Sequence, residues 1–293
     1  MKYNNIRGTG VALVTTFNDD GTIDYNSLEK VVNHVISGGV DYLVVMGTTG
    51  ESVTVTKSEK KEILDCILKT NNGRLPVVYG IGGNNTYDVV NTIKETHLND
   101  FEAVLSVSPY YNKPNQQGLY EHFKAIAESC SKPVILYNVP GRTGKNMSAG
   151  VTLRLANDFS NIIGIKEASG DIMQLMEILK NRPKDFMVIS GDDALTYPMI
   201  SLGGDGVISV VANAYPKEFA TMVKFALNNK KEEALDIHYR LLKMIGMLFE
   251  EGSPSGIKAL LQCMGLSKNI SRLPIAPVSD ELYKRIKNEI NNI

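Results

Sequence analysis

Eight short apolar segments, separated by longer segments with helical periodicity, constrain the fold of this chain more than any other feature. The predicted strands cover residues 10–15, 42–46, 77–79, 103–107, 134–138, 162–165, 187–190 and 206–210. The helices predicted between them cover residues 24–37, 57–70, 86–97, 116–129, 149–157, 172–180 and 194–201. The apolar runs are continuous rather than alternating, which is typical of a parallel sheet whose two faces are both buried.

Eight successive strand–helix units favour a closed α/β (β/α)₈ TIM barrel over an open, doubly wound sheet. No Gly-x-Gly-x-x-Gly follows the first strand, which weakens the dinucleotide-binding alternative. Helices alone are predicted after residue 210, at 216–228, 230–249, 255–263 and 279–291. We assign residues 1–225 to the catalytic barrel and residues 226–293 to a C-terminal helical appendage packed on the barrel or on a neighbouring subunit.

The charge balance excludes the most common classes of macromolecular partner. Lys and Arg total 31 against 32 Asp and Glu, so no basic excess points to nucleic acid or to an acidic membrane. The N-terminus lacks the apolar region of a secretory signal, and the apolar runs are too short to span a bilayer. We therefore expect a soluble cytoplasmic protein that acts on a small molecule.

Neither cysteine nor histidine spacing predicts a metal site. The three cysteines are far apart and odd in number, so we expect reduced thiols; they are Cys66, Cys130 and Cys263. The four histidines fall on predicted helices without metal-ligand spacing; they are His34, His97, His122 and His238. We expect no metal in this protein.

Lys166 is the strongest candidate for a catalytic residue. Reactive groups of a (β/α)₈ barrel collect at the C-terminal ends of the strands, and Lys166 directly follows the apolar residues 162–165. Burial can lower the pKa of a lysine by about 3–5 units and so provide a nucleophilic amine near neutral pH. The alternative is a structural lysine that reaches solvent or pairs with Glu167.

Polar residues after the neighbouring strands extend this candidate site. Tyr137 ends the preceding strand at an equivalent height, where its hydroxyl can transfer protons while Thr48 holds it by a hydrogen bond. Arg142 follows a Pro-Gly turn and offers a planar fork to a carboxylate. Thr48 and Thr49 lie between two glycines, where backbone N–H groups can hold a carboxylate. Each also has a purely structural reading as a buried tyrosine, a loop ion pair or a tight turn.

Three of these segments, in their order and spacing, resemble the dihydrodipicolinate synthase family of the N-acetylneuraminate lyase superfamily. They are Gly-Thr-Thr-Gly-Glu-Ser at 47–52, Tyr-Asn-Val-Pro-Gly-Arg-Thr-Gly at 137–144 and Ile-Lys-Glu-Ala-Ser-Gly at 165–170. The resemblance covers essentially the whole chain. It implies a lyase that condenses pyruvate with L-aspartate 4-semialdehyde to 4-hydroxy-tetrahydrodipicolinate, toward diaminopimelate and lysine, with neither a metal nor an organic cofactor.

The resemblance also implies a role for each site residue. Lys166 would form the Schiff base with pyruvate. The proton-relay positions would be Tyr137, Thr48 and Tyr111, with Tyr111 reaching into the site of a partner subunit. The substrate-binding positions would be Thr49 for the pyruvate carboxylate, Arg142 for the aldehyde's carboxylate, and the backbone of Gly191 and Ile208. A tyrosine that crosses subunits requires at least a dimer, and the resemblance favours a homotetramer.

One departure from the family concerns regulation. Feedback-inhibited members bind lysine near the subunit interface, with residues that match Ser52, Val53, Asn84, Asp88 and Tyr110. Where such enzymes carry two histidines after strand two, this chain has Lys57 and Lys60, and Asp88 replaces a glutamate. Two positive charges disfavour a cationic effector, so we predict weak or absent inhibition by lysine.

Two rival functions stay open. Another lyase of the superfamily, acting on sialic acid or a keto-deoxy sugar, would share Lys166 and Tyr137 but would not need Arg142. A barrel without catalysis would instead serve as a sensor of pyruvate or an amino acid. The intact set of lysine, tyrosine and threonine argues against the sensor.

Overall fold

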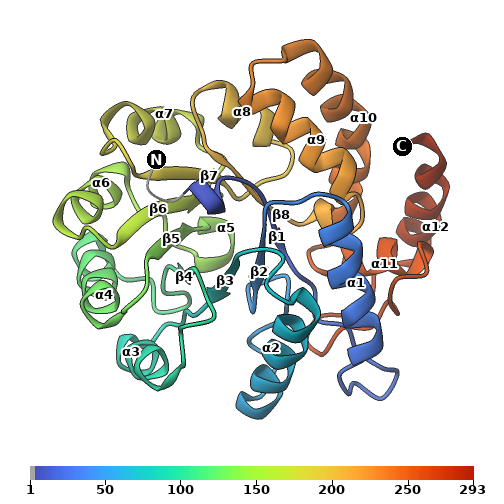
Figure 1. The fold of residues 1–293 in the computed structure, drawn as a ribbon, viewed down its shortest axis with the longest axis horizontal. Helices are drawn as coiled ribbons and strands as arrows, with labels where there is room; N and C mark the ends of the chain where they lie inside the picture. Colours follow the sequence, from blue (N-terminus) through green and yellow to red (C-terminus); the bar gives the residue numbers. More distant parts are fainter. Residues whose placement is uncertain (1–3) are drawn as a thin grey trace.

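The computed structural model describes residues 4–293 and contains a closed barrel of eight parallel strands, which confirms the predicted fold class (Figure 1). The strands pair in chain order, and β8 closes the barrel against β1. Their bounds are β1 Gly8–Ala12, β2 Tyr42–Val45, β3 Val77–Gly80, β4 Ala103–Val107, β5 Val134–Asn138, β6 Ile162–Glu167, β7 Met187–Ser190 and β8 Gly206–Ser209.

Helices surround the strands (Figure 1). A layer of buried apolar side chains lies between the strands and the helices. The barrel segment contains α1 Tyr25–Ser37, α2 Lys57–Asn71, α3 Thr86–Glu95, α4 Gln116–Ser129, α5 Pro140–Thr143, α6 Ala149–Asp158, α7 Ile172–Asn181, α8 Thr196–Ser201 and α9 Pro216–Leu227, with 3₁₀ turns η1 Asn4–Ile6 and η2 Val211–Asn213. Short polar residues begin several of these helices by accepting a backbone N–H; Thr56 and Glu59 form a full capping box at α2. These caps explain why the helices start where the sequence pattern places them.

Side chains alternate between two buried layers because successive strand residues point to opposite faces. A small apolar cluster fills the barrel interior and includes Val44, Ile135, Ile163 and Ile208. The larger cluster lies between the strands and the helices. An interior filled with apolar side chains leaves space for chemistry only at the ends of the barrel.

The structure corrects several predicted boundaries. The first strand covers Gly8–Ala12 rather than 10–15, although Leu13 and Val14 stay buried. Leu13 still donates its N–H to the carbonyl oxygen of Val44 at 3.0 Å, but the N–H of Val14 goes to the Asn213 side chain at 3.2 Å, so the backbone turns away from the sheet there. Strand β6 instead runs through Glu167, two residues beyond the predicted end.

The segment predicted as a Pro-Gly turn is the short helix α5. Proline suits its first turn because the fixed φ is helical and the missing N–H would have no partner there. Other helix ends differ from prediction by a few residues: α3 ends at Glu95, and α8 begins at Thr196. Such shifts are ordinary for element ends, because caps and turns decide them.

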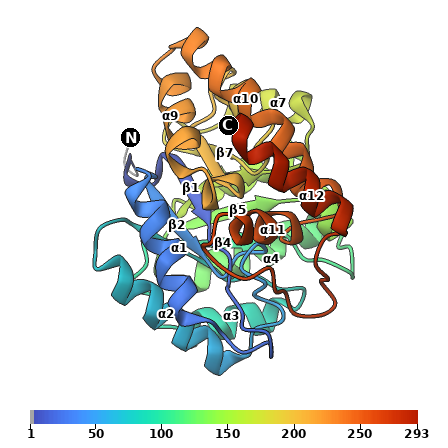
Figure 2. The ribbon, with the colours of Figure 1, turned by 90° about the vertical axis from the view of Figure 1, so that its right-hand side faces the viewer.

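The C-terminal region contains α10 Lys231–Glu250, α11 Ser255–Cys263, α12 Asp280–Glu289 and the 3₁₀ turn η3 Ile290–Asn292. Figure 2 shows α11 and α12 in front of the barrel, with α10 beside α9. Helix α9 packs on β1, β8 and α1, in the place of an eighth barrel helix. The division of the chain at residue 225 stays a prediction.

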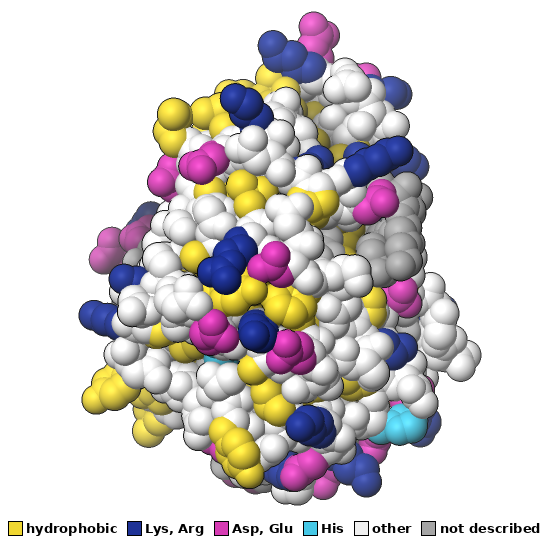
Figure 3. Space-filling model, turned by 90° about the vertical axis from the view of Figure 1, so that its left-hand side faces the viewer, with side chains coloured by type: hydrophobic (Ala, Val, Ile, Leu, Met, Phe, Trp, Pro, Cys, Tyr) yellow, Lys and Arg dark blue, Asp and Glu magenta, His cyan; other side chains and the backbone are white. Residues whose placement is uncertain are grey.

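The surface shows no segregation of charge on the face in Figure 3, where basic and acidic side chains are interspersed. The three cysteines are free thiols. No helix in the described part of the chain is both long and apolar enough to cross a membrane.

Candidate active site

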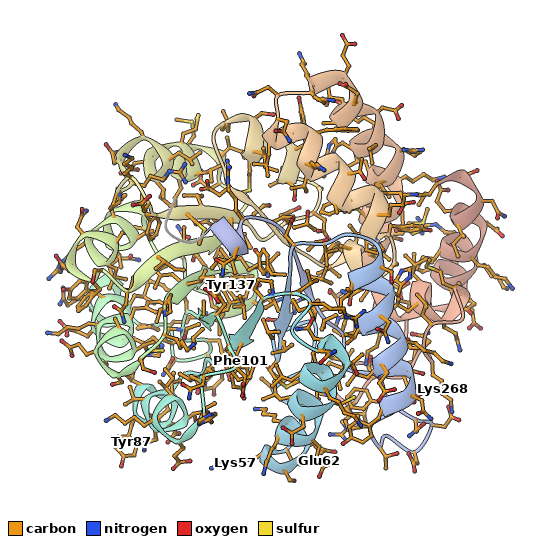
Figure 4. All side chains as sticks on the ribbon, in the orientation of Figure 1. Lys57, Glu62, Tyr87, Phe101, Tyr137 and Lys268 are labelled. Atoms are coloured by element: carbon orange, nitrogen blue, oxygen red, sulfur yellow. The ribbon has the colours of Figure 1, made fainter. Side chains whose placement is uncertain are left out.

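A cavity of about 240 Å³ opens at the C-terminal ends of the strands. It brings together seven of the eight site residues predicted from the sequence: Thr48, Thr49, Tyr137, Arg142, Lys166, Gly191 and Ile208. These residues come from five different strands or the loops after them. Figure 4 shows Tyr137 near the centre of the ring of strands. The barrel closure therefore collects residues that lie up to 160 positions apart in the chain.

Lys166 lies inside this cavity and is 6% exposed. The strand register pairs it with Tyr137 on β5, and its Nζ lies 4.4 Å from the centre of the Tyr137 ring. An ammonium at this distance is stabilised by the ring face, whereas a neutral amine is free to act as a nucleophile. Among the described residues, no carboxylate lies within ion-pair distance of Lys166. The structural alternatives of a solvated lysine or a Glu167 pair are therefore wrong.

Glu167 follows Lys166 but faces the outer layer. Its carboxylate accepts two bonds of 3.1 Å from the Asn138 amide, one of 2.7 Å from the Ser169 N–H and one of 3.2 Å from Gln174. Burial raises the pKa of Glu167, and these hydrogen bonds oppose the rise. Because Asn138 follows Tyr137 as Glu167 follows Lys166, this contact ties the two strands together directly behind the candidate reacting pair.

The loop after β2 presents the two threonines. Thr49 is buried and Thr48 is exposed, and both line the cavity. Backbone bonds from Gly50 to Gly47 (3.2 Å) and from Glu51 to Thr48 (3.0 Å) fold the loop into consecutive turns. Within residues 4–293 no hydrogen bond joins the hydroxyls of Thr48 and Tyr137, so the predicted contact between them is absent in this structure.

The opposite wall is formed by the ends of β7 and β8. A Cβ on Gly191 would lie 2.6 Å from the Ala168 Cβ and 3.0 Å from the Lys166 Cε, so only glycine leaves room for the lysine. Behind Ile208, the buried Asp193 accepts the N–H groups of Val210 (3.1 Å) and Val211 (2.9 Å). Burial raises the pKa of Asp193 to about 6. Asp193 thus fixes the end of β8 beside the cavity.

Arg142 lies on α5 at the cavity mouth and donates to the carbonyl oxygen of Ser253 at 3.0 Å. A second cavity of about 310 Å³ shares Thr48, Tyr137 and Arg142 with the first and extends to Tyr110 and Ile275. The two spaces adjoin at Tyr137. The guanidinium keeps free N–H groups for an anion in either of them.

Tyr111 is the predicted site residue that this chain does not bring to its own cavity. Its side chain is 89% exposed, and its φ of 73° holds a bulky residue in the left-handed region. Neither adjoining cavity includes it. An exposed tyrosine held in an unfavourable backbone conformation projects away from its own subunit.

The residues that match the family's lysine site line a third cavity of about 340 Å³ beside Tyr110. Lys60 lines it and is half-buried, and burial lowers the pKa of its amine. Lys57 does not line it: its Nζ pairs with Glu95 at 2.8 Å on the exposed end of α2 (Figure 4). Of the two lysines that underlie the prediction on lysine inhibition, only Lys60 faces this cavity.

The sequence interpretation missed the contribution of the C-terminal region. Phe249, Ser253 and Ile275 all line the cavities. It also missed a buried ion pair between Glu51 and Lys258; burial lowers the pKa of Lys258 to about 8, and Glu51 opposes this fall. The sequence did contain a signal for this ion pair: Lys258 is the one charged residue in the apolar run 257–261, and a buried charge requires a partner of opposite sign.

No group of three or more His, Cys, Asp or Glu side chains is arranged to hold a metal ion in residues 4–293. The arrangement can form an imine between a buried amine and a keto acid, beside a phenol that transfers protons and an arginine that holds an anion.

Comparison with known proteins agrees with this geometry. The profile described as the dihydrodipicolinate synthetase family matches residues 5–293. The chain is 56% identical to 4-hydroxy-tetrahydrodipicolinate synthase of Flavobacterium psychrophilum over 279 residues, 95% of each chain. It superimposes on the pyruvate complex of the chloride-inhibited dihydrodipicolinate synthase of Acinetobacter baumannii with a TM-score of 0.94 and 37% identity, covering 98% of each chain. A structure described as the first monomeric dihydrodipicolinate synthase variant gives a TM-score of 0.95 and 38% identity, covering 98% of this chain and 97% of that one. The chain belongs to the dihydrodipicolinate synthetase family.

Proposed function

We propose that this protein condenses pyruvate with L-aspartate 4-semialdehyde through a Schiff base on Lys166, giving 4-hydroxy-tetrahydrodipicolinate for the diaminopimelate and lysine pathway. The observation that carries the proposal is the buried amine of Lys166, in a cavity at the C-terminal barrel mouth and 4.4 Å from the Tyr137 ring. The relatives' names support the choice of product.

The first half of the reaction joins pyruvate to Lys166. Thr49 holds the carboxylate of pyruvate while the amine attacks its ketone carbon. Tyr137 supplies a proton to the leaving oxygen, water departs, and the carbon–nitrogen double bond forms. The protonated imine then accepts the electrons of a methyl C–H bond while the deprotonated Tyr137 takes the proton, and the resulting enamine is the carbon nucleophile.

The second half adds the aldehyde. The guanidinium of Arg142, which faces both adjoining cavities, holds the carboxylate of L-aspartate 4-semialdehyde. The enamine carbon attacks the aldehyde carbon, and Tyr137 returns the proton to the new hydroxyl with Tyr111 of a second subunit. Thr48 lines the same cavity but makes no hydrogen bond with Tyr137 in the described structure, so it would join this relay only after substrate binds. The amine of the added substrate displaces Lys166, closes the ring and releases the free enzyme. The imine is the electron sink, so the reaction needs neither a metal nor an organic cofactor.

Incubation with pyruvate and sodium borohydride, followed by peptide mass spectrometry, tests the first half. We expect a reduced pyruvyl adduct on Lys166 and none in the Lys166→Ala variant. Lys258 is an internal control, because it is also buried, burial lowers the pKa of its own amine to about 8, and it lies outside the 240 Å³ cavity. An adduct on Lys258 alone, or none at all, would refute the proposed mechanism and favour the sensor.

The second substrate separates the proposal from other lyases of the superfamily. We expect turnover when pyruvate and L-aspartate 4-semialdehyde are supplied together, measured by coupling the product to its reduction. Release of pyruvate from N-acetylneuraminate or a keto-deoxy sugar, at a higher kcat/KM than the condensation, would instead establish a retro-aldol function. Both reactions require Lys166, so the result of the adduct experiment does not depend on which of them the protein catalyses.

We also propose that the protein works as a homotetramer in which Tyr111 completes the site of a partner. The exposed Tyr111 and Val53 flank the site, and a second set of exposed apolar side chains lies on α7, at the end of α8 and on α10: Met173, Leu202 and Tyr239. Two separate apolar surfaces suit a dimer of dimers.

Mixed oligomers test the shared site. Homo-oligomers of Tyr111→Phe and of Lys166→Ala should both be nearly inactive. After unfolding and joint refolding, a hybrid contains sites with an intact Lys166 from one subunit and an intact Tyr111 from the other, and activity should return. Mixed oligomers that stay inactive would place Tyr111 in the site of its own subunit, and an active Tyr111→Phe homo-oligomer would place it outside the reaction. Sedimentation gives the subunit number directly.

A further inference from the structure

A buried ion pair outside the reacting residues joins the C-terminal region to the loop that carries Thr48 and Thr49. Glu51 follows this loop and Lys258 lies on α11, and their side chains are 0% and 1% exposed. They are separated by 207 positions in the sequence. A buried charge requires a partner of opposite sign, so this contact fixes the loop relative to α11.

Both members of the pair have further bonds within the C-terminal region. The second carboxylate oxygen of Glu51 accepts the N–H of Arg272 at 3.0 Å. Lys258 donates to the carbonyl oxygen of Ile270 at 2.7 Å, and its Nζ lies 4.3 Å from the centre of the Phe17 ring. Glu51 is therefore held from two points of the C-terminal region, Lys258 and Arg272.

The backbone of Glu51 adopts a conformation that its surrounding contacts must hold in place. Its φ of 52° lies in the left-handed region, which is unfavourable for glutamate. Its N–H donates to the carbonyl oxygen of Thr48 at 3.0 Å, and the Thr15 hydroxyl donates to the carbonyl oxygen of Gly50 at 2.6 Å. The position of Glu51 consequently determines the path of the loop through Thr48 and Thr49.

Charge gives the pair a second consequence. Glu51 lines the 310 Å³ cavity, which adjoins the cavity of Lys166, and the proposed substrates are both carboxylates. An unneutralised carboxylate at Glu51 would repel an anion bound by the neighbouring threonines. The ammonium of Lys258 cancels this charge without occupying the cavity itself.

We propose that Glu51 and Lys258 are positioning residues for the reaction. Their ion pair holds the loop that binds the pyruvate carboxylate against the C-terminal region, and it neutralises the charge of Glu51 beside that loop. This inference rests on the proposed function. It gives the C-terminal helices a role in catalysis through loop 47–52.

Single and double variants test it through the KM for pyruvate. In Lys258→Met the Glu51 carboxylate stays unpaired, and we expect the KM for pyruvate to rise about tenfold or more, the scale of a like-charge interaction inside a protein. In Glu51→Gln the Lys258 ammonium stays, so the KM should rise far less. The double variant Glu51→Gln/Lys258→Met removes both charges, and its KM should fall below that of Lys258→Met.

A merely structural ion pair predicts a different pattern. Both single variants break the same contact, so they would raise the KM for pyruvate equally, and this result would overturn the proposal. Lys243→Met is the matched control, because Lys243 pairs with Glu289 between α10 and the end of α12, away from the loop. We expect its KM to equal that of the unmodified protein.

Two further results keep the test decisive. If Lys258→Met does not fold, Glu51→Gln is compared with the double variant, and a higher KM for pyruvate in Glu51→Gln would overturn the proposal. The pyruvyl adduct on Lys166 is measured first in the unmodified protein. Its absence refutes the proposed function and this inference together, whereas a normal adduct with equal KM values in both single variants refutes the inference alone.

Discussion

Replacing Gly191 with alanine should impair the reaction of Lys166 while leaving the fold intact. The added Cβ would lie 2.6 Å from the Cβ of Ala168, and 3.0 Å and 3.2 Å from the Cε and Cγ of Lys166. Carbon atoms pack at about 3.5–4.0 Å, so the contact with Ala168 is too short by about 1 Å and the contacts with Lys166 by about 0.3–1 Å. The Ala168 contact is relieved by a small shift of the backbone after β6, and the Lys166 contacts by a movement of its flexible side chain, so the amine of Lys166 moves in either case.

The displacement of the amine determines how much imine formation should slow. A misplacement of about 1 Å between reacting groups can lower a rate about a hundredfold. We therefore expect Gly191→Ala to slow imine formation by about tenfold to a hundredfold, equivalent to about 1.4–2.7 kcal/mol of activation free energy. The thermal midpoint should change little, because the strain is relieved at the open end of the barrel.

The assay is the rate of pyruvate adduct formation on Lys166 under borohydride trapping, beside a thermal melt of each variant. Gly246→Ala is the matched control: it makes the same chemical change on the exposed face of α10, where nothing lies within 4 Å of the new Cβ. If Gly191→Ala forms the adduct within twofold of the unmodified rate, the steric reasoning is wrong.

Three other predictions follow from single side chains. Burial lowers the pKa of His122 from 6.5 to about 4, so the unfolded chain takes up this proton at a higher pH than the folded protein does. The free energy of unfolding should therefore fall by about 3 kcal/mol as the pH falls from 6.5 to 4. Urea unfolding of His122→Phe should lack this decrease, and the same pH dependence in the variant and the unmodified protein would contradict the prediction. Arg142→Lys replaces the planar guanidinium that donates to Ser253 with a compact ammonium group. The KM for the aldehyde should rise about tenfold, while the pyruvate adduct forms at its normal rate. Slower adduct formation would instead show that Arg142 binds pyruvate. Lysine should inhibit the unmodified protein only weakly. Because Lys60 lines the third cavity, Lys60→Met should lower the lysine concentration that gives half-maximal inhibition. Strong inhibition of the unmodified protein at low lysine concentration would refute this prediction.

The sequence alone determined the barrel and placed the candidate lysine, Lys166, at the C-terminal end of a strand. Continuous apolar strands that alternate with amphipathic helices have few other ways to bury their surface, and parallel strands present their C-terminal ends at one face. Lys166, Tyr137 and the loop after β2 could therefore be placed together because each follows a strand. These inferences use local periodicity and chain order, which a sequence contains directly.

The tertiary structure decided what depends on contacts between distant segments. The pairing of Glu51 with Lys258, the closeness of Ser253 to Arg142 and the different settings of Lys57 and Lys60 follow from how α11, α5 and α2 pack, and no local pattern encodes them. The end of β1 was also misplaced, because a buried apolar residue looks the same in sequence whether or not its backbone joins the sheet. Periodicity reports which residues are buried, whereas only packing selects the partner of each buried charge.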